Sequence, residues 1–238
     1  MYRRKILIAI FAAFIPNLAF AQNPQLLDLF HTIDKNAPTP EKSIIITEVM
    51  KAAVTIQKQT GVCVASSAEI EKIAPATGDR YIIEGAVTGR LKNGWTVYAK
   101  HPNCGTDVSR YLIMQAIDGS FETIRLNKGR SNANAKLIDD SLVSIYTFAS
   151  LAISKVNKKC NSKHILSATL GTTRIVNEES NLGPELYGVR FAGSWNEIWP
   201  VIICGQTAEV PVRFTADGDG GAYINMKSDE VKVLPVTQ

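Results

Sequence analysis

The residues of this chain best suited to covalent or metal chemistry are its four cysteines: Cys63, Cys104, Cys160 and Cys204. Histidines lie near two of them, in the patterns His101-x-x-Cys104 and Cys160-x-x-x-His164. Short-spaced Cys and His pairs of this kind hold structural zinc in many proteins. A zinc site here would leave the other two cysteines unpaired, so we expect two disulfides, no metal and no cofactor.

The N-terminus indicates the compartment in which these cysteines reside. Arg3, Arg4 and Lys5 precede an apolar run over residues 6–14, and Ala19-Phe20-Ala21 is a small-residue cleavage motif. This pattern is typical of a secretory signal peptide over residues 1–21, and an uncleaved anchor is the alternative. We expect cleavage after Ala21, a periplasmic or secreted mature chain, and no later run of membrane-spanning length. Export to an oxidising compartment favours disulfides over free thiols.

The charge composition of the mature chain argues against two classes of partner. The full chain of 238 residues has 26 Lys and Arg against 22 Asp and Glu, and the signal peptide carries three of the cations. A chain left with 23 cations and 22 anions has no electrostatic basis for binding nucleic acid or an anionic membrane surface. The mature length suits one large domain or two small ones.

An internal repeat organises the rest of the sequence. Trp95, Cys104 and Gly105 recur one hundred positions later as Trp195, Cys204 and Gly205. Arg at position 90 and Ala at position 116 are also matched at 190 and 216. The shared order and spacing predict a duplicated structural unit.

The repeat also selects one of the three possible disulfide pairings. Cys63 and Cys104 are 41 residues apart, and Cys160 and Cys204 are 44 residues apart. We therefore predict one bridge inside each unit, Cys63 to Cys104 and Cys160 to Cys204. Closing loops of this length stabilises each unit by about 3–4 kcal/mol if the bridge acts through the entropy of the unfolded chain.

Apolar periodicity and turn residues predict the secondary structure. Helices are expected over residues 23–33, 39–60 and 66–74, and a fourth opens at Asp139. The two long helices have apolar residues at helical spacing: Ile46, Val49, Ala53 and Ile56, then Leu142, Ile145, Ala149, Ile153 and Val156. Strands are expected over residues 81–91, 95–100, 108–117, 121–126, 186–193, 198–203, 208–215 and 222–226, with a hairpin turn at Asn93-Gly94.

These elements predict an α+β fold made of two tandem copies of one helix packed on a roughly four-stranded antiparallel sheet. Each copy has one internal disulfide, and the arrangement resembles the small cystatin-like α+β folds. Residues 22–38 form a short N-terminal helix and linker, 39–128 the first unit, 129–137 a linker and 138–238 the second unit.

Acidic residues offer two further possibilities for chemistry. The run Asp217-Gly218-Asp219-Gly220-Gly221 resembles part of a calcium loop, but an EF-hand loop needs ligands over twelve residues. Asp-Gly is also favoured in hairpin turns, and we interpret the run as a turn. Four glutamates could supply acid–base chemistry if the fold brought them together, and otherwise occupy exposed strand positions: Glu84, Glu122, Glu197 and Glu209.

Three tryptophans are the candidate partner-binding residues. Trp95 and Trp195 recur at matched positions, which favours a shared packing role in the two cores. Trp199 has Ala99 at the matched position. Because aromatic residues are enriched at interaction hot spots, Trp199 is the better candidate for contact with a partner.

The sequence has no nucleophile elbow, phosphate-binding glycine loop or HExxH motif. We therefore assign no catalytic residue. We expect a non-enzymatic protein-binding module of the bacterial cell envelope, of the inhibitor, immunity or secretion-accessory type, with a protein partner in the periplasm or outside the cell. One alternative is a small-ligand carrier with a pocket between helix and sheet. The other is a hydrolase that uses carboxylates in the cleft between the units.

Overall fold

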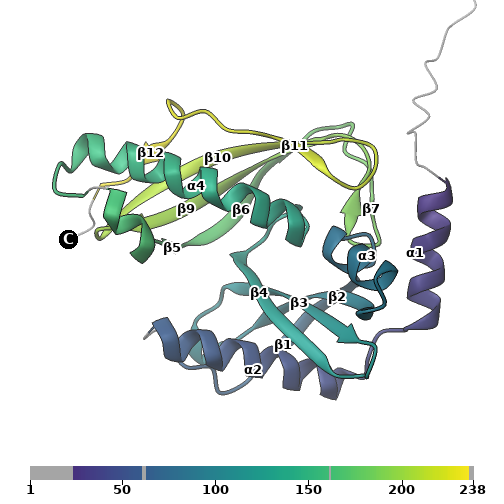
Figure 1. Ribbon diagram of the computed structural model, residues 1–238. Helices are drawn as coiled ribbons and strands as arrows, with labels where there is room; N and C mark the ends of the chain where they lie inside the picture. The colour runs from purple at the N-terminus through teal and green to yellow at the C-terminus, as the bar shows by residue number, and fades with distance from the viewer. Residues whose placement is uncertain (1–23, 61–62, 161, 236–238) are drawn as a thin grey trace, which may run out of the picture.

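The computed structural model describes residues 24–60, 63–160 and 162–235 (Figure 1). The signal peptide predicted for residues 1–21 lies outside the described residues. The described chain is an α+β protein with four α-helices and a large mixed sheet of ten strands. The α+β class is confirmed. The sequence predicts two separate sheets of about four strands, whereas the structure joins the strands into one sheet.

The sheet follows the order β1-β2-β3-β4-β6-β9-β10-β11, and β5 and β12 pair with β9 and β10. Its main strands are β1 (Glu69–Pro75), β2 (Leu91–Lys100), β3 (Val108–Ala116), β4 (Phe121–Gly129), β6 (Thr172–Glu178), β9 (Ser194–Ile203), β10 (Gln206–Ala216) and β11 (Ala222–Asn225). The short strands are β5 (Thr169–Leu170) and β12 (Lys232–Val233). All pairs are antiparallel except β4–β6, which is parallel and has only two residue pairs. This junction divides the sheet into an N-terminal half (β1–β4) and a C-terminal half (the remaining strands).

Helix α2 (Lys42–Thr60) covers one face of the N-terminal half, over β3 and β4 (Figure 1). Ile45, Val49 and Ala53 recur every four residues, so they lie on one side of the helix. They pack against Trp95 and Tyr111 of the sheet. The expected stripe included Ile46, but that residue is half-buried and Ile45 occupies the core position instead.

Helix α4 (Ala135–Val156) covers the C-terminal half and contacts β9 and β10. It begins four residues before the predicted Asp139, because the Asn134 side chain caps it by accepting a hydrogen bond from the Leu137 N–H (3.0 Å). Ile145, Ala149 and Ile153 lie in the core as predicted. Val156, predicted to be buried, is exposed at the helix end.

Helix α4 also corrects the expectation that no segment after the N-terminus approaches membrane-spanning length. It has 22 residues and a mean hydropathy of 1.3, so by length and composition alone it could cross a membrane. A core helix passes the same test, and 44% of its apolar window is buried inside the protein. In this fold, that apolar character serves packing against β9 and β10.

The segment predicted as a strand over residues 81–91 forms helix α3 (Arg80–Val87) instead. The Asp79 carboxylate accepts a hydrogen bond from the Tyr81 N–H (2.9 Å) and caps the helix. Asn93 and Gly94, predicted as a hairpin turn, lie inside β2. The Asn93 amide is buried and donates to the Ala37 carbonyl (3.0 Å). A Cβ on Gly94 would lie 2.3 Å from Ile82, so glycine lets α3 pack on β2.

Two other predicted elements have a different structure. The helix expected over residues 66–74 is mostly strand β1, which pairs with β2 along its length. The single strand expected over residues 186–193 contains a small hairpin, β7 (Glu185–Leu186) and β8 (Val189–Arg190). Tyr187 and Gly188 both have positive φ, at 52° and 83°, as a two-residue hairpin turn requires.

Helix α1 (Pro24–Asn36) forms where the sequence predicted an opening helix. Its residue Phe30 is fully buried against Val189 and Phe191, which follow the β7–β8 turn. The Asn93 amide also reaches Asp34 of this helix (3.2 Å). Helix α1 therefore contacts both the N-terminal half and the β7–β8 hairpin.

Both predicted disulfides are present with the predicted pairing. Cys63–Cys104 joins the segment after α2 to the short 3₁₀ helix η1 (Pro102–Cys104), and its Cα atoms are 5.5 Å apart. Cys160–Cys204 joins the segment after α4 to the residue after β9, with Cα atoms 6.0 Å apart. Each bridge ties the chain just after a long helix to the strands that this helix covers.

Candidate functional site

A groove of about 690 Å³ lies between the two halves of the sheet, and we call it the junction groove. The N-terminal half contributes residues from the loop after β2 and from β3 and β4: His101, Cys104, Asp107, Ser109, Arg125, Leu126, Asn127 and Lys128. The C-terminal half contributes residues from α4, β9 and the segment around β5: Tyr146, Ala168, Thr169, Leu170, Gly171, Thr172 and Ile202. The wall therefore mixes charged, hydroxyl and apolar side chains.

The base of the groove is the short parallel junction of β4 with β6. Gly129 has a φ of 90°, and a Cβ there would lie 2.0 Å from the Thr173 carbonyl oxygen, so glycine allows the strands to meet. Asp107 pairs with Lys128 Nζ of its own half (2.7 Å) and accepts a hydrogen bond across the junction from Thr172 Oγ1 (3.1 Å). The hydrogen bond from Lys128 lowers the pKa of Asp107. This carboxylate therefore holds the two halves together at one end of the groove.

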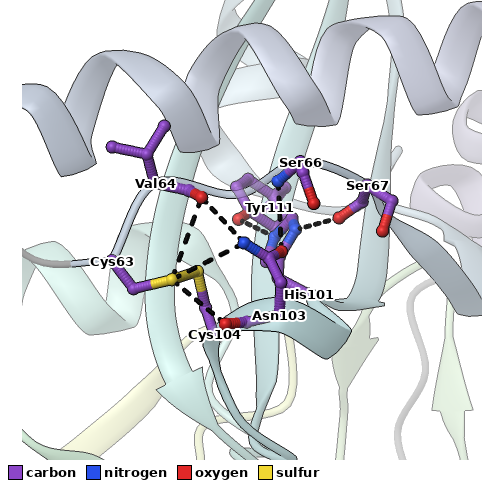
Figure 2. Close-up of a disulfide and its surroundings, with 8 residues drawn as sticks. All are labelled: Cys63, Val64, Ser66, Ser67, His101, Asn103, Cys104 and Tyr111. Atoms are coloured by element: carbon purple, nitrogen blue, oxygen red, sulfur yellow. Dashed lines mark hydrogen bonds between the residues drawn. A yellow bond between two sulfur atoms is a disulfide. The ribbon is translucent and has the colours of Figure 1, made fainter.

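One wall of the groove is built around the Cys63–Cys104 disulfide (Figure 2). The Asn103 amide donates to the Val64 carbonyl (2.9 Å) and accepts from the Ser66 N–H (3.1 Å). His101 is buried, with Nδ1 2.9 Å from the Ser67 carbonyl oxygen and Nε2 2.7 Å from the Tyr111 hydroxyl. The bridge and these hydrogen bonds together fix the segment after α2 against the sheet.

The same contacts decide against the zinc alternative. Both ring nitrogens of His101 are engaged, and Nδ1 must donate to the carbonyl of Ser67. Cys104 and Cys160 belong to different disulfides. His164 does approach the Cys160 and Cys204 sulfurs, within 4.8 Å, but both are bonded to each other, and zinc binds the thiolate form of cysteine. The structure does not assemble the four residues into one site.

The three candidate contact tryptophans all lie inside the protein. Trp95, Trp195 and Trp199 are 0%, 1% and 0% exposed. Trp95 and Trp195 were interpreted as core residues, and their burial agrees with that interpretation. The choice of Trp199 as a contact residue is wrong for this conformation, because its side chain packs in the core of the C-terminal half.

Glu197 lies between two of these tryptophans on one strand face and accepts a hydrogen bond from each. Trp195, Glu197 and Trp199 alternate on β9, so their side chains point to the same side of the sheet. Glu197 Oε1 accepts from Trp195 Nε1 (2.8 Å), and Oε2 accepts from Trp199 Nε1 (3.0 Å). Oε1 also accepts from Ser131 Oγ (3.0 Å) and the Asn132 N–H (2.7 Å). One buried carboxyl therefore holds the linker between the halves onto the C-terminal core.

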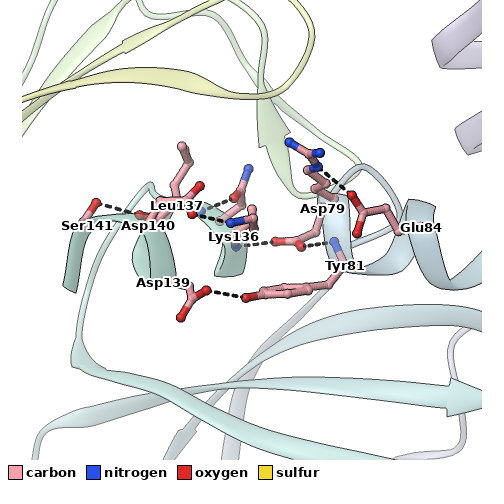
Figure 3. Close-up of polar contacts among 10 residues, drawn as sticks. Asp79, Tyr81, Glu84, Lys136, Leu137, Asp139, Asp140 and Ser141 are labelled. Carbon is pink, nitrogen blue, oxygen red and sulfur yellow. Dashed lines mark hydrogen bonds and ion pairs between the residues drawn. The ribbon is translucent and has the colours of Figure 1, made fainter. Parts of the chain in front are cut away.

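A second buried carboxyl, Asp79, holds α3 to the start of α4 (Figure 3). Besides capping α3, it accepts a hydrogen bond from the Lys136 N–H (3.3 Å). The Tyr81 hydroxyl donates to Asp139 (2.6 Å), and Lys136 pairs with Asp140. Burial is the main cause that raises the pKa of Asp79, and the hydrogen bonds that it accepts oppose the rise.

Arg110 completes the polar junction beneath the groove. Its guanidinium is buried and donates to the Ala133 carbonyl of the linker (3.0 Å) and to Asn127 (3.4 Å). It also lies over the Tyr98 ring, 5.3 Å from the ring centroid. Its positive charge acts on both Asp79 and Glu197 and lowers the pKa of each, against the larger effect of burial. Linker, sheet and helices are thus fixed by buried polar contacts.

The Asp79 carboxyl makes a testable contribution to the pH dependence of stability. Its pKa is raised in the folded state above about 3.9, the value for an unfolded chain. The folded protein therefore binds a proton that the unfolded chain releases, and the resulting stability is present below about pH 4 and lost as pH rises through the folded pKa. In urea unfolding from pH 3 to 8, the stability of wild type minus that of Asp79→Asn should fall with pH and then level off. A difference that rises with pH would contradict this assignment.

The four glutamates proposed for acid–base chemistry do not converge. Glu84 pairs with Arg80 (2.7 Å), and Glu209 pairs with Arg174 (2.8 Å). Glu197 is enclosed in the C-terminal core, and Glu122 is exposed on β4. Within the described part of the chain, no hydrogen bond or ion pair joins any two of the four. The expectation of exposed strand positions is wrong for Glu197, which is fully buried, and for Glu84, which lies on helix α3.

The Asp217–Gly221 run connects β10 to β11, as the hairpin interpretation predicted. Gly218 and Gly220 have φ values of 102° and 97°, which explains the glycines. Sequence reasoning missed Asp79 and Arg110, and it gave Glu197 a candidate acid–base role but no structural one. Only Glu197 had a local signal, since the spacing Trp195-x-Glu197-x-Trp199 places all three residues on one strand face.

Comparison with protein-family models, with curated proteins and with solved structures found no match to this chain.

Proposed function

We propose that this chain is an exported, non-enzymatic protein-binding module of the bacterial cell envelope, and that its partner binds along the junction groove. The observation that carries the proposal is the groove itself, which lies between two halves held at a fixed relative position. Asp107 accepts a hydrogen bond across the junction from Thr172, and Glu197 and Arg110 bind the linker between the halves. A groove that is preformed in this way binds without first paying the entropy of ordering its walls.

The repeat supports a recognition scaffold built by duplication. In each half, a long helix covers antiparallel strands and a disulfide follows that helix. The matched tryptophans, Trp95 and Trp195, are both buried beneath those helices. We infer two tandem α+β units, over residues 39–128 and 138–238, that have fused their sheets through the β4–β6 junction. The groove then lies where the units meet.

The position of the groove favours a protein over a small ligand carried between helix and sheet. The carrier alternative requires a pocket beneath α2 or α4. The space under α4 holds large core side chains such as Trp199 and Phe214, and the space under α2 holds Trp95 and Tyr111. The junction groove instead opens at the surface and presents Ile202, which is 41% exposed, beside polar groups.

The hydrolase alternative requires a carboxyl of raised pKa that faces the groove. Burial raises the pKa of both Asp79 and Glu197. Both carboxyls are enclosed and accept hydrogen bonds from several protein groups, and neither lines the junction groove. Asp107 does line it, but its pKa is lowered and Lys128 binds it. The geometry therefore supports recognition more strongly than acid–base catalysis.

The proposed compartment rests on two features. Residues 1–21 have the pattern of a signal peptide, and the two disulfides are compatible with an exported protein. Within this setting, an inhibitor or immunity protein and a secretion-accessory factor both bind a protein partner. The proposal covers either role.

The test is affinity capture with tagged mature protein from the envelope and culture-medium fractions of its own host. Wild type should recover one partner in near-equal amount. Ile202→Arg, which places a charge on the apolar wall of the groove, should recover at least about tenfold less. The matched control is Val143→Arg, because Val143 is 76% exposed on α4 and does not line the groove. Equal recovery by both variants, or no partner for wild type, would overturn the proposal.

A further inference from the structure

The outer edge of β4 is open along most of its length. On one side, β4 pairs with β3 from Phe121 to Lys128. On the other side, it pairs with β6 only at Lys128 and Gly129. In the ranges that the structure describes, no strand pairs with the outer side of residues 121–127. An edge of this kind presents unpaired main-chain N–H and C=O groups that a further strand can bind.

The hairpin geometry identifies which groups face outward. The β3–β4 turn is closed by a hydrogen bond from the Ala116 N–H to the Ser120 carbonyl (2.9 Å). In an antiparallel pair, successive residues alternate between facing the partner strand and facing away. Counting from Ser120, the main-chain groups of Glu122 and Ile124 face β3. Those of residues 121, 123 and 125 face away from β3, toward the open side.

A second groove, of about 390 Å³, lies between this open edge and α2, and we call it the edge groove. Its walls are Ala52 and Thr55 of α2 together with Thr123, Ile124 and Arg125 of β4, and the paired Glu48 and Lys51 complete it. Figure 1 shows β4 along the front of the N-terminal half, with α2 below it. A helix beside an open strand edge is the arrangement with which PDZ and PTB domains bind an extended peptide as an added strand.

Two polar groups in the edge groove have no hydrogen-bond or ion-pair partner among the described residues. The Thr123 hydroxyl oxygen is buried and makes no hydrogen bond within the described chain. Arg125 is exposed, and its guanidinium makes no hydrogen bond or ion pair with any described residue. The neighbouring cations are neutralised, since Lys51 pairs with Glu48 (2.6 Å) and Lys128 with Asp107. Within the described part of the chain, the charge of Arg125 at the strand edge is therefore not neutralised.

Arg125 also connects the two grooves. It lines both the edge groove and the junction groove, so the path along β4 runs from α2 into the space between the halves. Ile124, which is 37% exposed, supplies apolar surface on the opposite face of β4, because it pairs with Leu112 of that face whereas Arg125 pairs with Tyr111 of the α2 face. The surface thus offers main-chain hydrogen bonds, one positive charge and a small apolar patch along one line. An extended peptide with an acidic and an apolar side chain matches all three.

We propose that an extended segment of the partner protein adds to the sheet as a strand along β4, with an acidic side chain against Arg125 on the α2 face and a neighbouring apolar side chain against Ile124 on the opposite face. The inference rests on the proposed function and specifies how the partner is held. It places the main contact at the edge groove, from which the segment continues into the junction groove.

The opposite edge of the N-terminal half is unsuited to strand addition. Strand β1 ends in Pro75, and its register with β2 is irregular between Ile70 and Lys72. Glu71 pairs with Arg130 (2.5 Å), and Lys72 approaches Glu185 (3.8 Å). Proline, irregular register and charge are the features with which natural sheets block edge-to-edge pairing. Strand β4 also has a register shift, between Arg125 and Asn127, but it has no proline, it is regular from Phe121 to Arg125, and that edge faces a groove.

The test uses a phage-displayed library of random linear peptides selected on the immobilised mature protein. Enriched peptides are synthesised and titrated against wild type and variants by fluorescence anisotropy. Thr123→Pro removes an outward N–H but no bond to β3, and proline is tolerated on an edge strand when its missing N–H faces solvent. We expect at least about tenfold weaker binding, the effect of losing one or two hydrogen bonds at a contact.

Arg125→Glu provides a second variant that leaves the backbone unchanged. It should weaken binding about tenfold, and replacing the acidic residue of the peptide by lysine should restore affinity. The matched control is Lys158→Glu, the same charge reversal at an exposed residue after α4, which should change affinity less than twofold. In wild type, the bound peptide should slow hydrogen exchange at the Thr123 and Arg125 amides. Circular dichroism checks that each variant is folded.

The outcomes separate this inference from the proposed function. Peptides or the captured partner that bind Thr123→Pro and Arg125→Glu as well as wild type would overturn strand addition and leave the binding function standing. A library without enrichment would also overturn it. A concentration-dependent dimer that Thr123→Pro abolishes, with no peptide enriched, would show that a second copy of this chain occupies the edge. Failure of affinity capture alone would count against the proposed function first.

Discussion

Glu197→Leu should lower the free energy of unfolding by about 3–5 kcal/mol. Leucine keeps most of the volume of glutamate, so the loss reports hydrogen bonds more than a cavity. Without the carboxyl, three buried donors and one half-buried donor lose their acceptor: the indole N–H groups of Trp195 and Trp199, the Ser131 hydroxyl, and the Asn132 N–H. Each unsatisfied buried donor costs about 1–3 kcal/mol, and removing the cost of burying the carboxyl offsets part of that total.

Urea unfolding followed by tryptophan fluorescence measures this change, because two of the three tryptophans contact Glu197. The matched control is Glu209→Leu on the neighbouring strand β10. Glu209 pairs with the half-exposed Arg174, and loss of such a pair should cost less than about 1 kcal/mol. A double-mutant cycle with Trp199→Phe should show coupling, since phenylalanine removes one of the orphaned donors. A Glu197→Leu loss as small as that of the control would contradict the assigned network.

Glu197 also shows where sequence reasoning stopped short. The alternation of Trp195, Glu197 and Trp199 predicts a common strand face, and Trp195 was expected in the core. Together these two steps place Glu197 in the core as well. A glutamate on a strand was nevertheless assigned to the exposed face by default. What no local pattern contains is the partner that justifies its burial, because Ser131 and Asn132 lie more than sixty positions earlier.

The features that sequence did predict are those that repeat or that depend on short spacing. The disulfide pairing followed from the matched spacing of two loops, and the two long helices followed from apolar periodicity. By contrast, α3 was taken for a strand because Asn93-Gly94 matched a hairpin turn. Its true structure depends on Ile82, which packs over Gly94, and on the amide of Asn93, which binds Ala37. Those contacts exist only in the folded chain.

The parts of the candidate site were the least predictable from sequence. The junction groove and the edge groove arise from the way β4 leaves β3 and meets β6 at two residues. Arg125 and Thr123 carry no motif, and their importance follows from an open strand edge that is visible only in the sheet order. A recognition surface built from main-chain groups imposes little on side-chain identity, so a sequence pattern gives little sign of it.

Removing the two disulfides in turn should separate stability from recognition. The loops of 41 and 44 residues are nearly equal, so chain entropy alone gives each bridge about 4 kcal/mol. Each bridge has one exposed cysteine, Cys63 or Cys204, but Cys160 is buried in its core whereas Cys104 is only partly buried. Replacing Cys160 and Cys204 by alanine should therefore cost the same entropy plus the lost packing of a buried sulfur, about 1 kcal/mol more.

Replacing Cys63 and Cys104 by alanine should have the larger effect on binding. This bridge lies in the wall of the junction groove, where Asn103 and His101 hold the same segment through hydrogen bonds. Those hydrogen bonds hold part of the segment after α2 in place when the bridge is lost, so we expect a loss of about 3–4 kcal/mol in the free energy of unfolding. The same segment should become more mobile, and the groove wall that it forms should bind the partner less well. Urea unfolding and affinity capture on both double variants provide the comparison. If the Cys160–Cys204 variant instead loses the partner at temperatures where it stays folded, the recognition surface lies on the C-terminal half rather than along β4.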